Sequence, residues 1–523
     1  MYLNTNQGFN NFNKLLKNKK LYIDKSLILE ILNERVNSEM CNICVTRPRR
    51  FGKSQMTYLI ESYYSKALNS ESLFDKLAIS KTPEYKEYLN KFNVIKIDFS
   101  NISETHTTYQ EYMDRILYIF NKDLTASYPN LDLTKFVSIA DKLLATNEDF
   151  IFIFDEWDYI FNKNLYVENH NDFLEFLRNL LKGRSYVSLC YMTGILPIKK
   201  HSSGSALNMF EEYTLLDDGV FEEFFGFTEQ EVRSLCQKNK MDYKELEYWY
   251  NGYKTESGLK IFNPKSVNTA IIKKKCKSYW VNTGGMNEIL EYLEIDPTNV
   301  RDDIIRMIND EELDILIVEE FRAGQGIPTT KEEIYSAMIT LGFLTYSDGL
   351  LSIPNKELRQ EFEKALKDKC FGKTAELFKT SQMMLKATLS HDTDKMAQIL
   401  HEIHNREISL YDYNQENGLS GVVSIAYLSA RDRYRIEKEE HTGKGRADFT
   451  FHPLTSRDTP IIIELKRGKG TQVAIDQIIT QEYASKLFNL YKRNVLIVGI
   501  DYTEGKDHTC QVMELEYRSD KNE

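Results

Sequence analysis

The 523-residue sequence is poor in the residues that mark fibrous, disulfide-rich or unfolded proteins. It contains only 10 prolines and 24 glycines, which excludes collagen-like and largely disordered chains. Its 7 cysteines are few and odd in number, as in proteins of a reducing compartment. The chain is too long for one hydrophobic core, so we expect several domains.

The sequence also lacks long apolar runs and an excess of basic charge. No stretch reaches the roughly 18 apolar residues of a membrane span, and no signal peptide is visible, so we predict a cytoplasmic protein with no membrane contact. The net charge of −11 excludes a surface coated with basic charge for nucleic acid. Residues 431–493 reverse the sign locally, with 13 Lys/Arg against 9 Asp/Glu, as in a basic groove or an ordinary solvated face.

Three regions differ in their hydrophobic patterns. Residues 1–215 alternate helical stretches with short apolar strands, which predicts an α/β domain with a parallel sheet; the strands are expected at 41–46, 94–99, 150–154 and 186–192. Residues 216–395 show mostly helical periods, typical of a lid or connector. Residues 396–523 predict a helix, three strands, a helix and a strand, at 413–428, 435–439, 446–451, 460–465, 472–488 and 495–500.

A turn rich in charge follows the first predicted strand and ends in Gly52, Lys53 and Ser54. Between a strand and a helix, such a turn points backbone N–H groups at phosphate; the lysine reaches the β- and γ-phosphates and the serine hydroxyl binds Mg²⁺. Arg47 stands where this motif usually has its first glycine, and a Gly-Lys-Ser triplet alone is common by chance. We predict a phosphate-binding loop whose nucleotide contacts include Arg50, Gly52, Lys53 and Ser54.

Asp155 and Glu156 directly follow the apolar run 150–154. In a nucleotide site, Asp155 would hold Mg²⁺ through water and Glu156 would orient or deprotonate the attacking water. Two acids that simply cap a strand are the alternative, but their order after the loop motif favours an ATP site. Thr193 closes the next strand, where it would either contact the γ-phosphate or form a turn before Gly194.

A second group of charged residues lies near the C-terminal end. Glu464 and Lys466 are two apart on one predicted strand, so they share a face, and the adjoining strand brings Asp448 to them. Two carboxylates are hard oxygen ligands for Mg²⁺ or Mn²⁺, and Lys466 would orient water and stabilise transition-state charge. An exposed edge strand is the alternative, but the preceding isoleucine triplet favours a central strand. Glu416 and Gln477, on the flanking helices, are further candidates.

Two other patterns invite a metal interpretation that we do not favour. Cys41 and Cys44 lead into a predicted strand, in which residues three apart point to opposite faces, so we expect two buried thiols. His401 and His404 are three apart, whereas the zinc helix motif needs two imidazoles four apart, so we predict a solvated helix face.

Together these motifs resemble a bacterial family that has an AAA-ATPase-like N-terminal domain and a PD-(D/E)XK nuclease-superfamily C-terminal domain. The resemblance covers residues 10–285 and 410–500. In the first part it rests on residues 22–26, 47–54, 154–158, 193–195, 225–228, 249–253 and 279–283. In the second part it rests on residues 445–448, 464–466 and 477–478, with Tyr483.

The resemblance implies a restriction-endonuclease-like core over residues 410–500. It also implies that the catalytic residues are Glu416, Asp448, Glu464 and Lys466, supported by Gln477. In this family the missing first glycine is usual, so Arg47 is a family trait, which supports nucleotide binding and leaves hydrolysis open. Gln481 departs from the family, which often has lysine there, and this change would alter contacts to the phosphate backbone.

The sequence therefore predicts a nucleotide-binding protein that cleaves phosphodiester bonds with Mg²⁺ or Mn²⁺, with the ATPase-like domain gating or assisting. The expected partner is nucleic acid, with DNA favoured over RNA, and a homo-oligomer is compatible with the pattern. One alternative is a nucleotide-dependent switch whose nuclease fold only binds nucleic acid. Another is a motor-type ATPase with a vestigial C-terminal domain.

Overall fold

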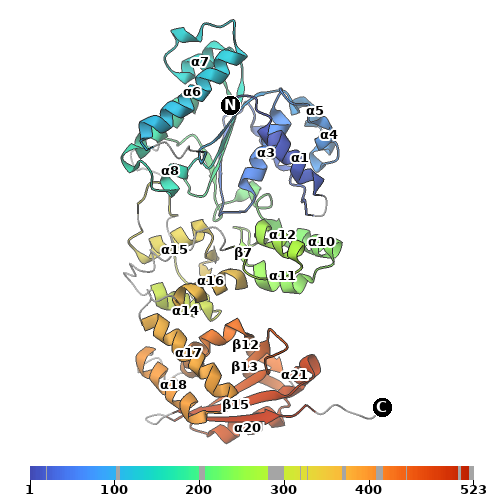
Figure 1. The fold of residues 1–523 in the computed structure, drawn as a ribbon, viewed down its shortest axis with the longest axis vertical. Coiled ribbons are helices and arrows are strands. Elements are labelled where there is room, and N and C mark those ends of the chain that lie inside the picture. The colour runs from blue at the N-terminus through green and yellow to red at the C-terminus, as the bar shows by residue number, and fades with distance from the viewer. Residues whose placement is uncertain are drawn as a thin grey trace. The chain divides into compact units, whose positions relative to one another are not determined.

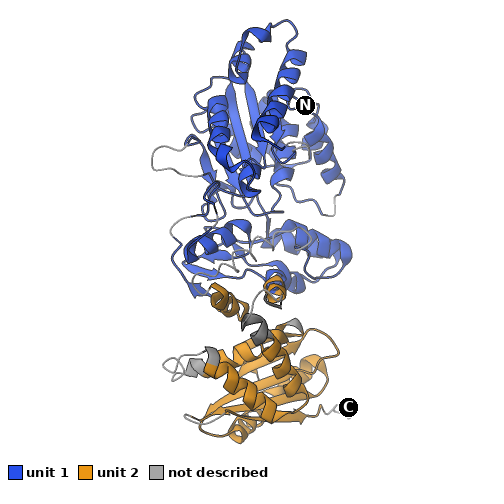
Figure 2. Cartoon of the chain, turned by 60° about the vertical axis from the view of Figure 1, so that its left-hand side comes forward, with its two compact units in different colours: residues 1–298, 312–359 blue, residues 299–311, 360–523 orange. Residues whose placement is uncertain are grey.

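A computed structural model describes residues 1–18, 21–101, 107–198, 206–280, 300–317, 320–326, 328–367, 373–407, 416–442, 444–503 and 508–517. The side chains of residues 366, 367, 373–378, 406, 407, 416–418 and 432 lie outside this description. The chain forms two compact units, coloured separately in Figure 2. The first contains residues 1–298 and 312–359, and the second contains residues 299–311 and 360–523.

The first unit contains a five-stranded sheet in which all neighbouring strands are parallel. The strand order is β2-β3-β4-β1-β5, and the strands are β1 (Asn42–Thr46), β2 (Asn93–Asp98), β3 (Phe150–Asp155), β4 (Val187–Gly194) and β5 (Glu211–Tyr213). Every residue of β1, β3 and β4 is buried, as their near-continuous apolar runs require. The four expected strands are present, and the α/β prediction is confirmed.

Helices cover both faces of this sheet (Figure 1). On one side lie α1 (Gln7–Lys17), α3 (Lys53–Tyr64), α4 (Glu71–Phe74) and α5 (Tyr85–Tyr88). On the other side lie α6 (Tyr109–Ser127), α7 (Ile139–Ala145) and α8 (Tyr159–Asn162). α2 (Ile28–Arg35) contributes to the first layer, and α9 (His170–Leu181) packs its Phe173 against Phe99 in the second. Two covered faces explain why β3 has no polar residue before its final acid.

The rest of the first unit is mainly helical, with short strands. α10 (Glu229–Asn239), α11 (Tyr243–Tyr250) and α12 (Pro264–Lys273) share one hydrophobic core. Beside them runs a sheet of order β6-β8-β7, made of Phe227–Thr228, Lys260–Phe262 and Tyr253–Lys254. A further sheet, β10-β11-β9, comprises Thr345–Ser347, Leu350–Ser352 and Leu313–Asp314, with α15 (Lys331–Leu341) and the start of α16 (Lys356–Lys367).

The second unit contains a five-stranded mixed sheet of order β12-β13-β14-β15-β16. Its strands are β12 (Tyr434–Thr442), β13 (Gly445–Pro453), β14 (Ile461–Arg467), β15 (Val495–Tyr502) and β16 (His508–Leu515). Only the β14–β15 pair is parallel; the other neighbours are antiparallel. β14 is therefore central, as its isoleucine triplet predicts, and β16 is a strand that the sequence did not predict.

The helices of the second unit differ from expectation at two points. They are α14 (Val300–Ile308), α17 (Lys373–Leu389), α18 (Thr393–Glu407), α19 (Glu416–Ala426), α20 (Thr471–Thr480) and α21 (Ala484–Tyr491). The single helix predicted at 472–488 is wrong, because the chain breaks between α20 and α21 at Glu482, whose φ is 55°. His404 on α18 is not solvated: it is buried and packs on Tyr502 and His508.

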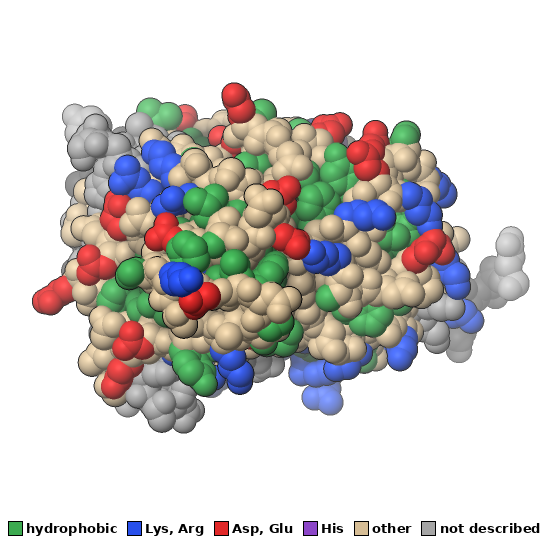
Figure 3. All heavy atoms as spheres, turned by 90° about the horizontal axis from the view of Figure 1, so that it is seen from above, with side chains coloured by type: hydrophobic (Ala, Val, Ile, Leu, Met, Phe, Trp, Pro, Cys, Tyr) green, Lys and Arg blue, Asp and Glu red, His purple; other side chains and the backbone are tan. Residues whose placement is uncertain are grey.

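The surface drawn in Figure 3 carries basic and acidic side chains side by side, with scattered apolar ones between them. This mixture agrees with a net charge of −11 that arises from 67 basic and 78 acidic residues. Within the described part of the chain, no helix has both the length and the apolar character needed to cross a membrane.

Candidate functional sites

The loop between β1 and α3 has the local geometry of a phosphate cradle. Gly52 precedes the first residue of α3 and adopts φ 96°, in the left-handed region that favours glycine. Arg50, two residues earlier, also has a positive φ, of 73°. No side chain caps the N-terminus of α3, so its first N–H groups remain available to an anion.

Lys53 is buried at the start of α3, and its Nζ donates to two carbonyls of its own loop. The acceptors are the oxygens of Arg47, at 2.8 Å, and Pro48, at 3.0 Å. Burial lowers the pKa of Lys53 to about 8, although Asp158, Glu156 and Asp155 oppose this shift. The ammonium therefore sits inside the loop, within the field of three carboxylates, with one N–H donor left beyond its two carbonyl contacts.

Asp155 closes β3 and is buried, while Glu156 follows it with a strained φ of 48°. Burial raises the pKa of Asp155 to about 6, and a hydrogen bond with Ser54 works against that rise. The pKa of Glu156 is raised as well, mainly by burial. A serine hydroxyl beside a buried carboxylate fits a divalent cation, which would relieve the cost of burying that charge.

β4 lies between β1 and β3, which places its last residues between the loop and the acids. Thr193 is buried there, and its hydroxyl donates to the carbonyl of Val45 at 2.8 Å. Asp158, for which no role was predicted, accepts from the N–H groups of Ile195 and Leu196 at 3.0 and 2.8 Å. Both side chains therefore hold the end of β4 in position, and Asp158 could have been found only by its place in the acidic run after β3.

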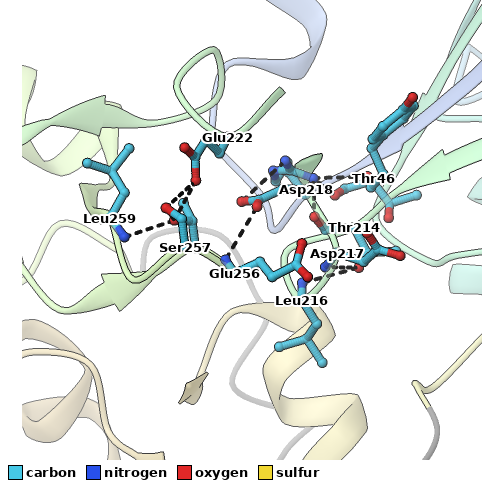
Figure 4. A network of polar contacts seen from close by, with 12 residues as sticks. Thr46, Thr214, Leu216, Asp217, Asp218, Glu222, Glu256, Ser257 and Leu259 are labelled. Atoms are coloured by element: carbon cyan, nitrogen blue, oxygen red, sulfur yellow. Dashed lines mark hydrogen bonds and ion pairs between the residues drawn. The ribbon is translucent and has the colours of Figure 1, made fainter. Parts of the chain in front are cut away.

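Arg47, at the position of the usual first glycine, is one of the largest fully buried side chains. Its Nη1 donates to the carbonyls of Thr46, Tyr213 and Thr214, at 2.8, 2.9 and 2.6 Å. Its Nη2 lies 3.8 Å from Asp218, which in turn accepts from the N–H of Glu256, as Figure 4 shows. Arg47 thus ties the loop to residues 213–218 and through them to the turn before β8.

A cavity of about 660 Å³ opens beside this loop. The loop and the start of α3 form part of its wall, together with α1, residues 21–25 and one face of α12, and residues 156, 195, 224, 226 and 227 complete it. Most of the remaining lining is apolar, as at Leu15, Leu59 and Ile272. A phosphate cradle beside an apolar cavity of this size matches the usual form of a site for a nucleotide-sized ligand.

In the second unit, Asp448, Glu464 and Lys466 meet on β13 and β14. The pairing of Phe449 with Ile463 sets the register, and the N–H of Leu465 donates to Asp448 Oδ2 at 2.7 Å. Lys466 Nζ donates to Glu464 Oε1 at 2.8 Å and to the carbonyl of its neighbour Leu465 at 3.0 Å. The three side chains predicted from the sequence therefore lie together.

Glu464 is the most perturbed acid of this group. It is buried, and its Oε2 has no hydrogen-bond partner in the described part of the structure. Burial, followed by the charge of Asp448, raises the pKa of Glu464 to about 7. A buried carboxylate oxygen without a partner beside a second carboxylate fits a divalent cation, which would satisfy both.

The structure places the residues around the Asp448 and Glu464 pair only in part as predicted. Gln477 on α20 donates to the hydroxyl of Tyr483 at 3.2 Å, and Tyr483 lies so close to Gly445 that a Cβ there would meet its Oη at 2.8 Å. Glu416 begins α19, but its side chain lies outside the described residues. Asp501 was not predicted: it is buried on β15, in register with Lys466, and accepts from the N–H of Lys469 at 3.1 Å. Its position at the end of an apolar strand was the signal.

A separate polar group lies on β12 and β13. Glu437, Glu440 and His452 have ligand atoms close enough to share a metal ion. Glu440 already accepts from His452 at 2.8 Å and also pairs with Lys486. Against burial, these two partners lower the pKa of Glu440. The group is an internal ion-pair network, distinct from the pair Asp448 and Glu464.

These features define a chain in which a unit built on a parallel sheet, with a phosphate-binding type of loop, precedes a unit built on a mixed sheet. Comparison with family models agrees: residues 6–203 match a family described as predicted AAA-ATPase, and residues 415–512 match the PD-(D/E)XK nuclease superfamily. The chain therefore has an AAA-ATPase-like N-terminal domain and a C-terminal domain of the PD-(D/E)XK nuclease superfamily.

Comparison with whole proteins adds little. No curated protein matches the sequence. Among solved structures, the Walker-type ATPase of Pyrococcus abyssi is similar over 65% of this chain and 94% of its own, with 14% identity and a TM-score of 0.31. That score is too low to support any argument about this chain.

Proposed function

We propose that the protein is a metal-dependent nuclease whose ATPase-like domain binds ATP and gates or assists cleavage of nucleic acid. The observation that carries the nuclease part is the buried, unpartnered Oε2 of Glu464 beside Asp448 and Lys466. A buried carboxylate oxygen without a partner, beside a second acid, is unfavourable in a purely structural role, because burying its charge costs free energy.

In this proposal Asp448 and Glu464 hold Mg²⁺ or Mn²⁺. Such a cation, when bound, polarises the scissile phosphate and lowers the pKa of a water molecule. Glu464 must be ionised for this, so cation binding would displace its proton. Lys466 would exchange its bond to Glu464 for contact with the attacking water or the phosphate, and Gln477 and Tyr483 would support the site. Glu416 is proposed as a further acid.

At the other site, Gly52, Lys53 and the start of α3 would hold the phosphates of ATP, with Arg50 as a further contact. Ser54 and Asp155 would hold its Mg²⁺, and Glu156 would orient water. Thr193 would act through the end of β4, since its hydroxyl is engaged by Val45. DNA is favoured over RNA as the substrate of the nuclease site.

The alternative of a nucleotide-dependent switch without cleavage has one observation in its favour. Lys53 donates to two carbonyls of its own loop, so a phosphate that competes for these donors would loosen the loop. That rearrangement would serve a switch as well as a gate.

The test is a cleavage assay on single- and double-stranded DNA and RNA with Mg²⁺ or Mn²⁺. Glu464→Gln should abolish both metal binding and cleavage. Lys466→Ala should keep metal binding, because both carboxylates remain, and should slow cleavage by about 10²-fold, the usual scale for one positioned charged group. A wild-type protein that cuts no substrate would favour the switch, and undiminished cutting by Lys466→Ala would show that the active site lies elsewhere.

A further inference from the structure

The phosphate loop contacts three later segments of the first unit. The ring of Pro48 packs against Gly342, so closely that a Cβ built on Gly342 would lie 2.5 Å from the Cβ of Pro48. Phe51 holds its ring perpendicular to that of Tyr253, with 5.0 Å between the ring centroids. The carbonyl of Phe51 also accepts from the N–H of Gly226 at 3.2 Å. The conformation of the loop therefore depends on residues far along the chain.

Tyr253, on β7, joins the loop to the end of α15. The side chain of Tyr253 is buried, and its hydroxyl donates to the carbonyl of Gly342 at 2.8 Å. Gly342 ends α15 with a φ of 84°, in the left-handed region that favours glycine. The next residue of β7, Lys254, donates its N–H to the hydroxyl of Thr345 on β10 at 3.2 Å. The loop, β7 and the turn from α15 into β10 therefore form one packed group.

The start of α16 is held by two of the motifs on which the family resemblance rests. A Cβ built on Gly252 would lie 1.6 Å from the carbonyl oxygen of Pro354, so only glycine allows this approach of the two backbones. The N–H groups of Tyr279 and Trp280 donate to Oε1 of Glu357 at 2.6 and 2.9 Å. Both motifs therefore fix the segment that leads from β11 into α16.

The loop is linked to this segment by charge as well. Burial lowers the pKa of Arg50, and the negative charge of Glu357 opposes that shift. From Gln360 onwards the chain of α16 belongs to the second unit. A change in the loop that reached the first turn of α16 would thus reach the helix that continues into the nuclease-like part of the chain.

We infer that the nucleotide state of the phosphate loop is relayed to the start of α16 through Pro48, Gly342 and Tyr253. The inference rests on the nucleotide binding proposed above, and it specifies how the ATPase-like domain would act as a gate. Lys53 donates to the carbonyl of Pro48 at 3.0 Å, and a phosphate that takes over this donor releases that carbonyl. Pro48 then packs less tightly on Gly342, which loosens the hairpin of β10 and β11 that precedes α16.

The experiment is hydrogen exchange of the full chain, measured by mass spectrometry with and without ATP and Mg²⁺, beside calorimetric titration of ATP. In wild type, ATP should speed exchange in residues 343–353 by about two- to tenfold, the scale of one weakened hydrogen bond. Tyr253→Phe keeps the ring and removes the donor to Gly342. This variant should exchange faster already without ATP, show no further change with ATP, and keep its ATP affinity within about twofold. A purely structural role for the hydroxyl would raise both rates and preserve the difference.

The matched control is Tyr186→Phe. The hydroxyl of Tyr186 is also buried and also donates to a backbone carbonyl, that of Leu180. Tyr186 precedes β4, at the opposite end of that strand from Gly194, to whose carbonyl the loop donates through the N–H of Arg47. Tyr186→Phe should therefore match wild type in ATP affinity and in the response of residues 343–353.

The outcomes separate this relay from the nucleotide site itself. If wild type binds ATP and exchange in residues 343–353 is unchanged or slower, the relay is overturned and the nucleotide site stands. That comparison needs no variant, so the inference remains testable even if Tyr253→Phe fails to fold. An undiminished ATP response in Tyr253→Phe overturns the relay as well. If wild type binds no ATP, the proposed nucleotide site falls, and the relay falls with it.

Discussion

Glu464 links the chemistry of the nuclease site to pH. Its pKa is raised to about 7, chiefly by burial and then by Asp448, and metal binding needs the ionised form. Metal-dependent cleavage should therefore fall about tenfold for each pH unit below 7 and level off above it. A pH–rate profile with saturating Mn²⁺ and then with limiting Mn²⁺ checks this, since only limiting metal should reveal the full dependence. A flat profile between pH 5.5 and 7 at limiting Mn²⁺ would contradict this prediction.

The same residue has the opposite effect on stability without metal. The folded protein keeps this proton up to pH near 7, whereas the unfolded chain releases it near the ordinary value of 4.5. The stabilisation is therefore complete below the unfolded pKa and is lost as pH rises towards 7. Glu464→Gln should remove this decline, so the variant should melt at a higher temperature than wild type at pH 8. Melting curves with chelator at pH 5 and pH 8 test the sign.

Replacing Arg47 by the glycine that this loop motif usually has should destabilise the protein. Arg47→Gly would restore the first glycine but leave Asp218 buried without its cationic partner. Breaking a buried pair from one side should lower the free energy of unfolding by about 3–5 kcal/mol. Adding Asp218→Asn should recover part of that loss. Urea unfolding of the two single variants and the double variant measures the coupling, and simple additivity would show that the two side chains do not interact.

At the scale of elements, α17 packs against the rest of the C-terminal domain, so a stable fragment of that domain should include α17. Thr388 on α17 bonds with the hydroxyl of Tyr427 at 2.7 Å, and Met384 is buried beside it. A fragment of residues 360–523 should unfold cooperatively. The fragment 396–523, which begins after α17, should be less stable by at least about 2 kcal/mol, the cost of exposing one or two buried side chains. Equal urea midpoints for the two fragments would show that α17 is dispensable.

The strands that could be predicted from the sequence are those that are buried on both faces. β3 and the first three residues of β14 are apolar because both faces are covered, and the acids that follow these apolar runs stood out for that reason. β16 is an edge strand with mostly half-exposed residues, so it lacked an apolar pattern. The break at Glu482 has no proline or glycine to mark it, and it is set by the packing of Tyr483.

At both sites, the sequence identified candidate residues but not the groups to which they are hydrogen-bonded. Asp448, Glu464 and Lys466 were found because strand spacing places them on one face. The burial of Arg47 could not be found in this way, because two of its three acceptors lie more than 160 residues further along the chain.

At the scale of the whole molecule, the two compact units should respond to different ligands. Calorimetry should resolve two unfolding transitions, one raised by ATP with Mg²⁺ and the other by Mn²⁺ alone. A ligand at about 100 times its Kd contributes roughly 2.7 kcal/mol to the unit that binds it. Lys53→Ala should abolish the first shift, since it removes a charge-assisted contact worth about 1.5–3 kcal/mol. Glu464→Gln should abolish the second. A variant that loses both shifts would contradict the separation.

The hydrogen bonds from Lys53 to carbonyls of its own loop affect how tightly the loop can bind phosphate. The ammonium has three N–H groups, and two of them already bind the carbonyls of Arg47 and Pro48, so one is left for a phosphate oxygen while the loop keeps its contacts. A phosphate that takes over one of the two carbonyl contacts gives up the free energy of that contact, so we expect the loop and the ligand to compete for one ammonium group.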